Sequence, residues 1–165
     1  MQYAQALQET LANETTYTVR VGVGSICQSL QELAGSYKAA RQACTLGAVF
    51  APGENVHLYS QLLLERILSE IPPEARKSYA SVLTGRLREN RLDTEETYTI
   101  ADMLLDTNLN VAETARKLYM HRNTLTYRLN NLHRATGLDL RCFRDAMLYR
   151  ILMDMEKCDE GEQNT

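Results

Sequence analysis

The side chains best suited to chemistry in this 165-residue chain are gathered between positions 121 and 134. They carry guanidinium, amide, imidazole and hydroxyl groups, which can hydrogen-bond to base edges and to phosphates. The set comprises His121, Arg122, Asn123, Thr124, Thr126, Tyr127, Arg128, Asn130 and Arg134. Because these groups match the donors and acceptors of the major groove, the segment is a candidate binding surface for double-stranded DNA.

The order of these residues predicts different roles along the segment. The first turn of a reading helix is the part that contacts bases, so Arg122 could pair bidentately with guanine and Asn123 with adenine. Asn123 could instead cap the helix, and Thr124 could cap it or contact a phosphate. Tyr127, Arg128 and Arg134 are better placed for phosphates, which position a protein without specifying sequence.

Two short helices joined by a tight corner must position these residues. Asn110 is a suitable N-cap for a first helix over 111–118, in which Ala115 would allow close crossing of the two helices. Met120 would fill the corner. In the second helix an apolar stripe with spacing i, i+4, i+7 should face the core, and Gly137 should end the helix. The stripe comprises Leu125, Leu129 and Leu132.

Charge is distributed unevenly along the chain. The net charge is -3, yet the segment 111–150 holds eight arginines and lysines against three carboxylates. No acidic residue occurs between Arg116 and Leu138. An acidic body with one basic module is typical of some DNA-binding proteins. A solvated helix face, or a protein-interaction module that docks its basic helix on an acidic partner, would show the same charge pattern.

The segment ETARKLYMHRNTLTYRLNNLHRATGLDL resembles the C-terminal helix-turn-helix of the PucR/CdaR transcriptional regulators. The shared features are the dipeptides Thr114-Ala115 and Thr136-Gly137 and the core HxNTLxYRL, and the similarity spans roughly Leu104 to Met155. A generic helix-turn-helix prefers glycine where Tyr119 stands, but this family commonly tolerates a bulky residue there. The resemblance implies a regulator that acts as an oligomer, such as a dimer, with its small-molecule effector sensed by domains outside this chain.

Upstream, the segments VRVGVGS, YKAA and HLYSQLLL resemble the last part of the GGDEF-like domain of CdaR-type regulators. No GGDEF signature occurs, so nucleotide cyclisation is not expected. Residues 22–27 hold two glycines after a strand, but they lack the third glycine of a dinucleotide fingerprint and the lysine of a Walker motif. A strand-exit turn is the better interpretation. The chain shows no recognisable catalytic set, so we expect no enzyme activity and no cofactor.

The predicted elements place an α/β segment before a helical one. In residues 1–71 we expect helices at 2–11, 30–50 and 60–71 and strands at 16–23 and 56–59. Ser60 would cap the third of these helices. That helix should turn four residues inward: Leu63, Leu64, Ile67 and Leu68. Two strands are too few for a stable sheet, so this part would be the end of a larger α/β domain or would lean on a partner.

From residue 72 onward only helices are expected. Pro73 can open one of them, and Asp93 followed by Glu96 resembles a capping box for a helix reaching Leu105. A last helix over 143–155 should bury Met147, Ile151, Leu152 and Met155. The fold class is therefore mainly α, or α+β overall. The domains would be a partial α/β segment at 1–71, a helix-turn-helix domain at 72–157 and a frayed acidic tail at 158–165.

Composition indicates where the protein works. The four cysteines are scattered without a CxxC pair, which predicts reduced thiols and no structural metal site. They are Cys27, Cys44, Cys142 and Cys158. No apolar run approaches the length of a membrane helix, and residues 1–10 do not resemble a secretory signal. We therefore expect a cytoplasmic protein without a membrane partner.

Overall fold

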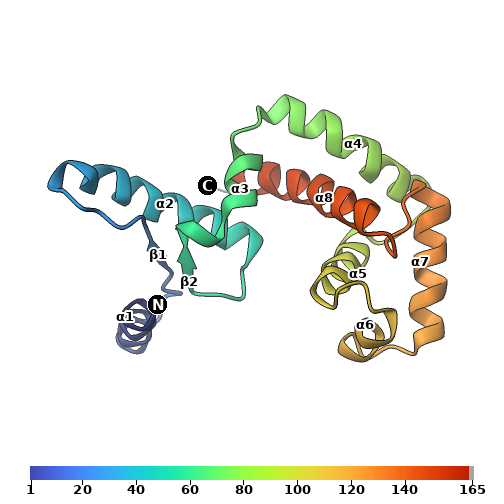
Figure 1. Cartoon of the computed structure of the whole chain (residues 1–165), viewed down its shortest axis with the longest axis horizontal. Helices are drawn as coiled ribbons and strands as arrows, with labels where there is room; N and C mark the ends of the chain where they lie inside the picture. Colours follow the sequence, from blue (N-terminus) through green and yellow to red (C-terminus); the bar gives the residue numbers. More distant parts are fainter. Residues whose placement is uncertain (164–165) are drawn as a thin grey trace. The chain divides into compact units, whose positions relative to one another are not determined.

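The computed structural model describes residues 1–163, with side chains as far as Cys158. It divides into two compact units, one built mainly from Met1–Ile71 and the other from Pro72–Asp159. The described residues form mainly α-helices together with one small two-stranded sheet, which confirms the predicted fold class (Figure 1). None of the described helices is both long enough and apolar enough to cross a lipid bilayer.

The first unit is a strand–helix–strand arrangement. Strand β1 (Val21–Val23) pairs in parallel with β2 (Val56–Leu58), with Val21 opposite Val56. Helix α2 (Leu33–Phe50) connects the two strands and packs against both, after a 3-10 turn, η1 (Leu30–Glu32). Helix α1 (Gln2–Glu14) contacts both strands, and η2 (Tyr59–Gln61) and α3 (Leu63–Ser69) complete the unit.

Glycines allow the close approach of strand and helix in this unit. A Cβ on Gly22, in the middle of β1, would lie 2.0 Å from the carbonyl oxygen of Ala40 on α2. A Cβ on Gly47 would lie 2.1 Å from Cγ of the buried His57 ring. The glycine-rich stretch after residue 21 is therefore explained by packing against α2, and Gly22 belongs to the strand itself rather than to an exit turn.

Several expectations for the first unit were wrong in detail. The first strand begins at Val21 rather than at position 16, since only three residues find partners on the equally short β2. Ser60 lies in η2 and caps nothing, because α3 begins after Leu62. Leu68 is buried as predicted, but Leu63 and Ile67 are exposed. The short α3 buries only the side that carries Leu68, so the side with Leu63 and Ile67 has no packing partner among the described residues.

The second unit consists of helices that share one core. They are α4 (Pro73–Glu89), α5 (Thr94–Asp106), α6 (Val111–Lys117), α7 (Arg122–Thr136) and α8 (Phe143–Gln163). Pro73 opens α4 at its first turn, as predicted. Leucines from α4, α5 and α7 meet in the core together with Leu140 and residues of α8. Burial of this apolar surface is the main force that holds α7 in place.

The face that helix α8 turns to the core overlaps only partly with the predicted one, since Met155 is buried and Leu152 packs against the core. Its most deeply buried residues before Asp154 are Ala146, Tyr149 and Met153, and among the predicted residues only Met155 is buried. The segment is apolar on several sides, so periodicity alone did not select the stripe. Tyr149 determines which face of α8 turns inward, because its hydroxyl donates a hydrogen bond of 2.6 Å to Oγ1 of Thr97 in the core.

The predicted acidic tail at 158–165 begins within α8 rather than after it. Helix α8 continues to Gln163, and residues 164–165 lie outside the described part of the chain.

A polar network joins α5 to α8. The hydroxyl of Tyr98 donates to Oδ1 of Asp154 at 2.9 Å, and Nε of Arg150 donates to Oδ2 of the same carboxylate at 2.8 Å. Arg150 also forms an ion pair with Asp102. Burial raises the pKa of the Asp154 carboxyl, although Arg150 and Tyr98 both favour its charged form. Asp102 therefore belongs to a structural network that fixes the packing of α5 on α8.

Candidate nucleic-acid interface

Helix α7 has one buried side and one polar side. Leu125, Leu129 and Leu132 are almost completely buried in the core, as their spacing predicted. His121, Arg122, Asn123, Thr124, Tyr127 and Arg134 are exposed, and Thr126, Arg128 and Asn130 are half-buried. The leucine stripe thus orients the helix so that most of the predicted site residues face solvent.

The corner before α7 is fixed by hydrogen bonds at both ends of α6. Oδ1 of Asn110 accepts from the N–H groups of Ala112 and Glu113 at 3.1 and 3.2 Å, which confirms the predicted N-cap. At the other end the N–H of Tyr119 donates to the carbonyl of Arg116, and that of Met120 donates to the carbonyl of Ala115. This pair of bonds is the Schellman motif. Ala115 is buried as expected, and Met120 in the corner is half-buried.

His121 caps the start of α7. Its Nδ1 accepts a hydrogen bond of 3.2 Å from the N–H of Asn123. The sequence left open whether Asn123 or Thr124 caps this helix. In the structure His121 is the cap, so neither of the two is needed for it. Within the described part of the chain, the side chains of Arg122, Asn123 and Thr124 form no hydrogen bond or ion pair. Their donors and acceptors are available to a ligand.

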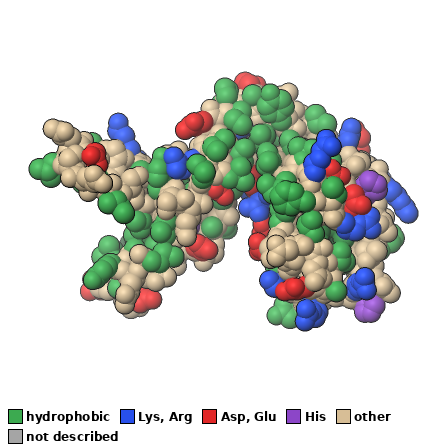
Figure 2. Space-filling view, viewed as in Figure 1, with side chains coloured by type: hydrophobic (Ala, Val, Ile, Leu, Met, Phe, Trp, Pro, Cys, Tyr) green, Lys and Arg blue, Asp and Glu red, His purple; other side chains and the backbone are tan. Residues whose placement is uncertain are grey.

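Exposed cations gather on the same side of the second unit. Figure 2 shows lysine, arginine and histidine side chains over α6 and α7. Arg116, Lys117, Arg122 and Arg134 are exposed, and no ion pair is formed by any of them among the described residues. Because α7 contains no carboxylate, a phosphate approaching its amino end meets no negative side chain from this helix.

Residues 99–155 match the family model of the PucR C-terminal helix-turn-helix domain, and residues 2–46 match that of the GGDEF-like domain. The first match covers the second part of α5, all of α6 and α7, and most of α8. Residues 99–155 form a PucR-type helix-turn-helix domain. The resemblance seen in the sequence is therefore confirmed for the helix-turn-helix and, upstream, for the segments up to residue 46, whereas HLYSQLLL lies outside the match.

Known relatives of this chain include three named bacterial regulators. It is 24% identical over 155 residues to the purine catabolism regulatory protein of Bacillus subtilis, covering 94% of this chain and 29% of that protein. It is 27% identical to the carbohydrate diacid regulator of Escherichia coli, covering 84% of this chain and 36% of that protein. For the proline-responsive transcriptional activator PutR of Bacillus subtilis the identity is 28%, with coverage of 84% and 35%. The chain thus spans about a third of each relative's length.

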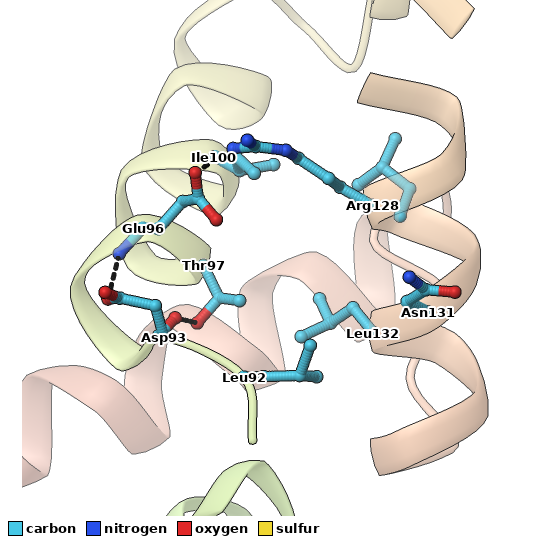
Figure 3. A pocket seen from close by; sticks show the side chains of 9 residues that line it. Leu92, Asp93, Glu96, Thr97, Ile100, Arg128, Asn131 and Leu132 are labelled. Atoms are coloured by element: carbon cyan, nitrogen blue, oxygen red, sulfur yellow. Dashed lines mark hydrogen bonds and ion pairs between the residues drawn. The ribbon is translucent and has the colours of Figure 1, made fainter. Parts of the chain in front are cut away.

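Arg128 in the PucR-type domain has a partner inside the protein. Figure 3 shows its guanidinium reaching from α7 to the carboxylate of Glu96 on α5, with which it forms an ion pair. The two residues border a small pocket of about 50 Å³ between the helices. Asp93 caps α5 by accepting from the N–H of Glu96 at 2.9 Å, so only one of the two capping-box contacts forms. Glu96 is used for Arg128 instead.

Arg86 anchors the opposite end of α7. Its Nη1 donates a hydrogen bond of 2.6 Å to the carbonyl oxygen of Thr136, and the end of α4 lies beside the end of α7 (Figure 1). Gly137 adopts a φ of 80° and ends the helix, as predicted. A cation at a helix C-terminus is favoured by the macrodipole. Sequence reasoning missed Arg86 and expected Glu96 only as part of a capping box, because neither residue lies near α7 in the chain.

Proposed function

We propose that this chain is the C-terminal portion of a sequence-specific, DNA-binding transcriptional regulator, with α7 reading the major groove. The main support is the start of α7, where three exposed polar side chains have no partner in the described structure, while the leucine stripe of the same helix is buried. A helix presented in this way fits the groove, whose width admits one α-helix. The proposal assigns no catalysis to the chain and places its action in the cytoplasm.

Within this proposal the residues divide by their contact chemistry into base readers and phosphate binders. Arg122 and Asn123 read base edges from the first turn of α7, assisted by His121, Thr124, Thr126 and Asn130. Tyr127 and Arg134 contact phosphates. Arg128 can do so only in exchange for its ion pair with Glu96, so we assign it a secondary role.

The relatives extend the proposal to the organisation of the whole regulator. Each carries a name that denotes regulation and is about three times longer than the matched region. We propose that residues 1–71 are the end of a GGDEF-like domain, that residues 72–157 bind DNA, and that other domains sense the effector. One helix-turn-helix offers few base contacts, so a homodimer on two half-sites would raise both affinity and specificity.

The proposal is tested by selecting duplexes from a random DNA pool and titrating the enriched duplex against a scrambled one. We expect enrichment of one motif and an affinity ratio of about 10³ or more over the scrambled duplex. Binding should weaken with salt, by about 0.9 in log–log slope for each phosphate neutralised. A salt-dependent interaction without any enriched motif would contradict the proposal and favour docking on an acidic protein partner.

Arg122→Ala tests the base contact directly. Loss of a bidentate guanine contact should cost about 1–3 kcal/mol and relax the preference at one base pair. Arg88→Ala on α4 is the matched control, since it removes the same charge from an exposed position of the same unit. An equal loss of affinity on every duplex would show that Arg122 contacts a phosphate instead.

Arg134→Ala tests the phosphate contacts. The variant should bind all duplexes more weakly by a similar factor and lower the salt slope by about one. A change in the preferred motif would instead make Arg134 a base-reading residue.

A further inference from the structure

Tyr119 occupies the corner between α6 and α7 with a backbone conformation that tyrosine rarely adopts. Its φ is 53°, in the left-handed region, at the position of the Schellman motif where glycine is usual. The strain comes from the Cβ of a non-glycine residue, so glycine at this position would avoid it. The fold therefore carries a cost for having a side chain here.

The Tyr119 side chain makes no contact among the described residues that would offset this strain. It is 98% exposed, and in the described structure neither its ring nor its hydroxyl has a partner. Two other corners of the second unit, at Arg91 and Asn108, use the same pair of backbone bonds with a positive φ. Asparagine tolerates this conformation, and its occurrence at 108 needs no further explanation. Arg91, Leu109 and Tyr119 lack that tolerance, and among these three Tyr119 has an almost fully exposed aromatic side chain.

The surroundings of Tyr119 indicate what it contacts. Arg116 and Lys117 precede it at the end of α6, His121 and Arg122 follow it at the start of α7, and all four are exposed. A phenol hydroxyl among cations is a neutral donor on a surface suited to a polyanion. In a helix-turn-helix the first helix crosses the DNA backbone while the second enters the groove, so the corner lies at the groove's rim.

We propose that Tyr119 is a further DNA-contacting residue, whose hydroxyl donates a hydrogen bond to a phosphate oxygen at the rim of the major groove. The proposal rests on the proposed function, because it requires α7 to enter that groove. The contact is to the backbone, so it adds affinity on every sequence and no base preference. It also neutralises no charge and releases no counterion, which separates it from the neighbouring arginines and lysine.

Tyr119→Phe isolates the hydroxyl. On the duplex enriched by selection, and on a scrambled duplex, the variant should bind about three- to tenfold more weakly by the same factor, as expected for one lost hydrogen bond. The salt slope should stay at the wild-type value, whereas Lys117→Gln should lower it if Lys117 contacts a phosphate. Tyr79→Phe is the matched control, since this exposed tyrosine lies on α4 and should change nothing.

Tyr119→Gly separates the contact from a structural role. Glycine relieves the backbone strain, so the variant should unfold at a higher temperature while binding DNA at least as weakly as Tyr119→Phe. Asn108→Gly is the matched corner substitution and should leave DNA affinity unchanged. Lower stability of Tyr119→Gly together with unchanged binding would make Tyr119 a structural residue and overturn the proposal.

The outcomes for Tyr119 and for the proposed function are distinguishable. Wild-type affinity from Tyr119→Phe, or a loss confined to one duplex, would overturn the phosphate contact while leaving the reading role of α7 intact. If the wild-type protein itself bound no DNA, the function and the Tyr119 contact would both be wrong.

Discussion

The two units of this chain differ in how completely they bury their apolar residues. The second unit closes a core in which leucines of α4, α5 and α7 are fully buried. The first buries mainly Ala39, Ala43, Leu46 and Leu68 and leaves large apolar side chains exposed, including Ile26 at 94% and Leu30 at 90%. Its sheet has only two short strands. The helix-turn-helix unit therefore has the contacts of a self-sufficient domain, whereas residues 1–71 do not.

The largest expected effect comes from breaking the core of the second unit. Leu129→Ala should lower the free energy of unfolding by about 2–5 kcal/mol, because it removes a fully buried side chain and leaves a cavity. Leu30→Ala in the first unit should change it by less than about 0.5 kcal/mol. Chemical denaturation followed by circular dichroism measures both. Similar losses from the two variants would refute the comparison.

An alkaline titration gives the next largest effect. Burial raises the pKa of Tyr149 to about 12, so the unfolded chain loses this proton first, near pH 10. The stability contributed by Tyr149 is complete below pH 10 and is lost as the pH rises toward 12, by up to about 3 kcal/mol. Tyr149→Phe should reduce this alkaline loss. The exposed Tyr17→Phe in the first unit should leave it unchanged, and equal curves for wild type and Tyr149→Phe would contradict the prediction.

A substitution in the first unit should weaken that unit without affecting the second. Gly22→Ala places a Cβ against the backbone oxygen of Ala40, which should destabilise the first unit by about 1–3 kcal/mol. Hydrogen exchange should then accelerate at amides of α2 while those of α5 and α7 keep their protection. Faster exchange in both units would mean that they unfold together.

The smallest effect is expected at the ion pair between α5 and α7. Glu96→Gln should lower stability by only about 0.2–1 kcal/mol, because both partners are partly exposed. Freed from Glu96, Arg128 should contact a phosphate and steepen the salt slope of DNA binding by about one. Calorimetry and a DNA titration at several salt concentrations check the two effects. An unchanged slope would exclude Arg128 from the interface.

The helix-turn-helix could be predicted from the sequence because its signals are local. The Asn110 cap, the leucines at 125, 129 and 132, and Gly137 all act within one or two helical turns of themselves. The polar set at the start of α7 followed from the same spacing, since whatever is not buried must face outward.

The remaining contacts depend on packing between distant segments. Arg128 and Glu96 are 32 residues apart, and Arg86 and Thr136 are 50 apart, so no periodicity links them. The inward face of α8 was predicted only in part for a similar reason, because the hydrogen bond of Tyr149 to Thr97 selects one of several apolar stripes. In α3, Leu63 and Ile67 stay exposed because the first unit is too small to cover both sides of this helix, which the sequence does not reveal.

The ends of α5, α6 and α7 have a consequence for how the second unit reaches its native state. Each of these helices begins with a side-chain cap, at Asp93, Asn110 and His121, and is followed within one or two positions by a left-handed residue. These caps and helix ends are local contacts that can form before distant segments meet. Proteins rich in short-range contacts cross their transition state quickly. Refolding of this unit after dilution from denaturant should therefore finish within milliseconds, well before a proline isomerisation could register.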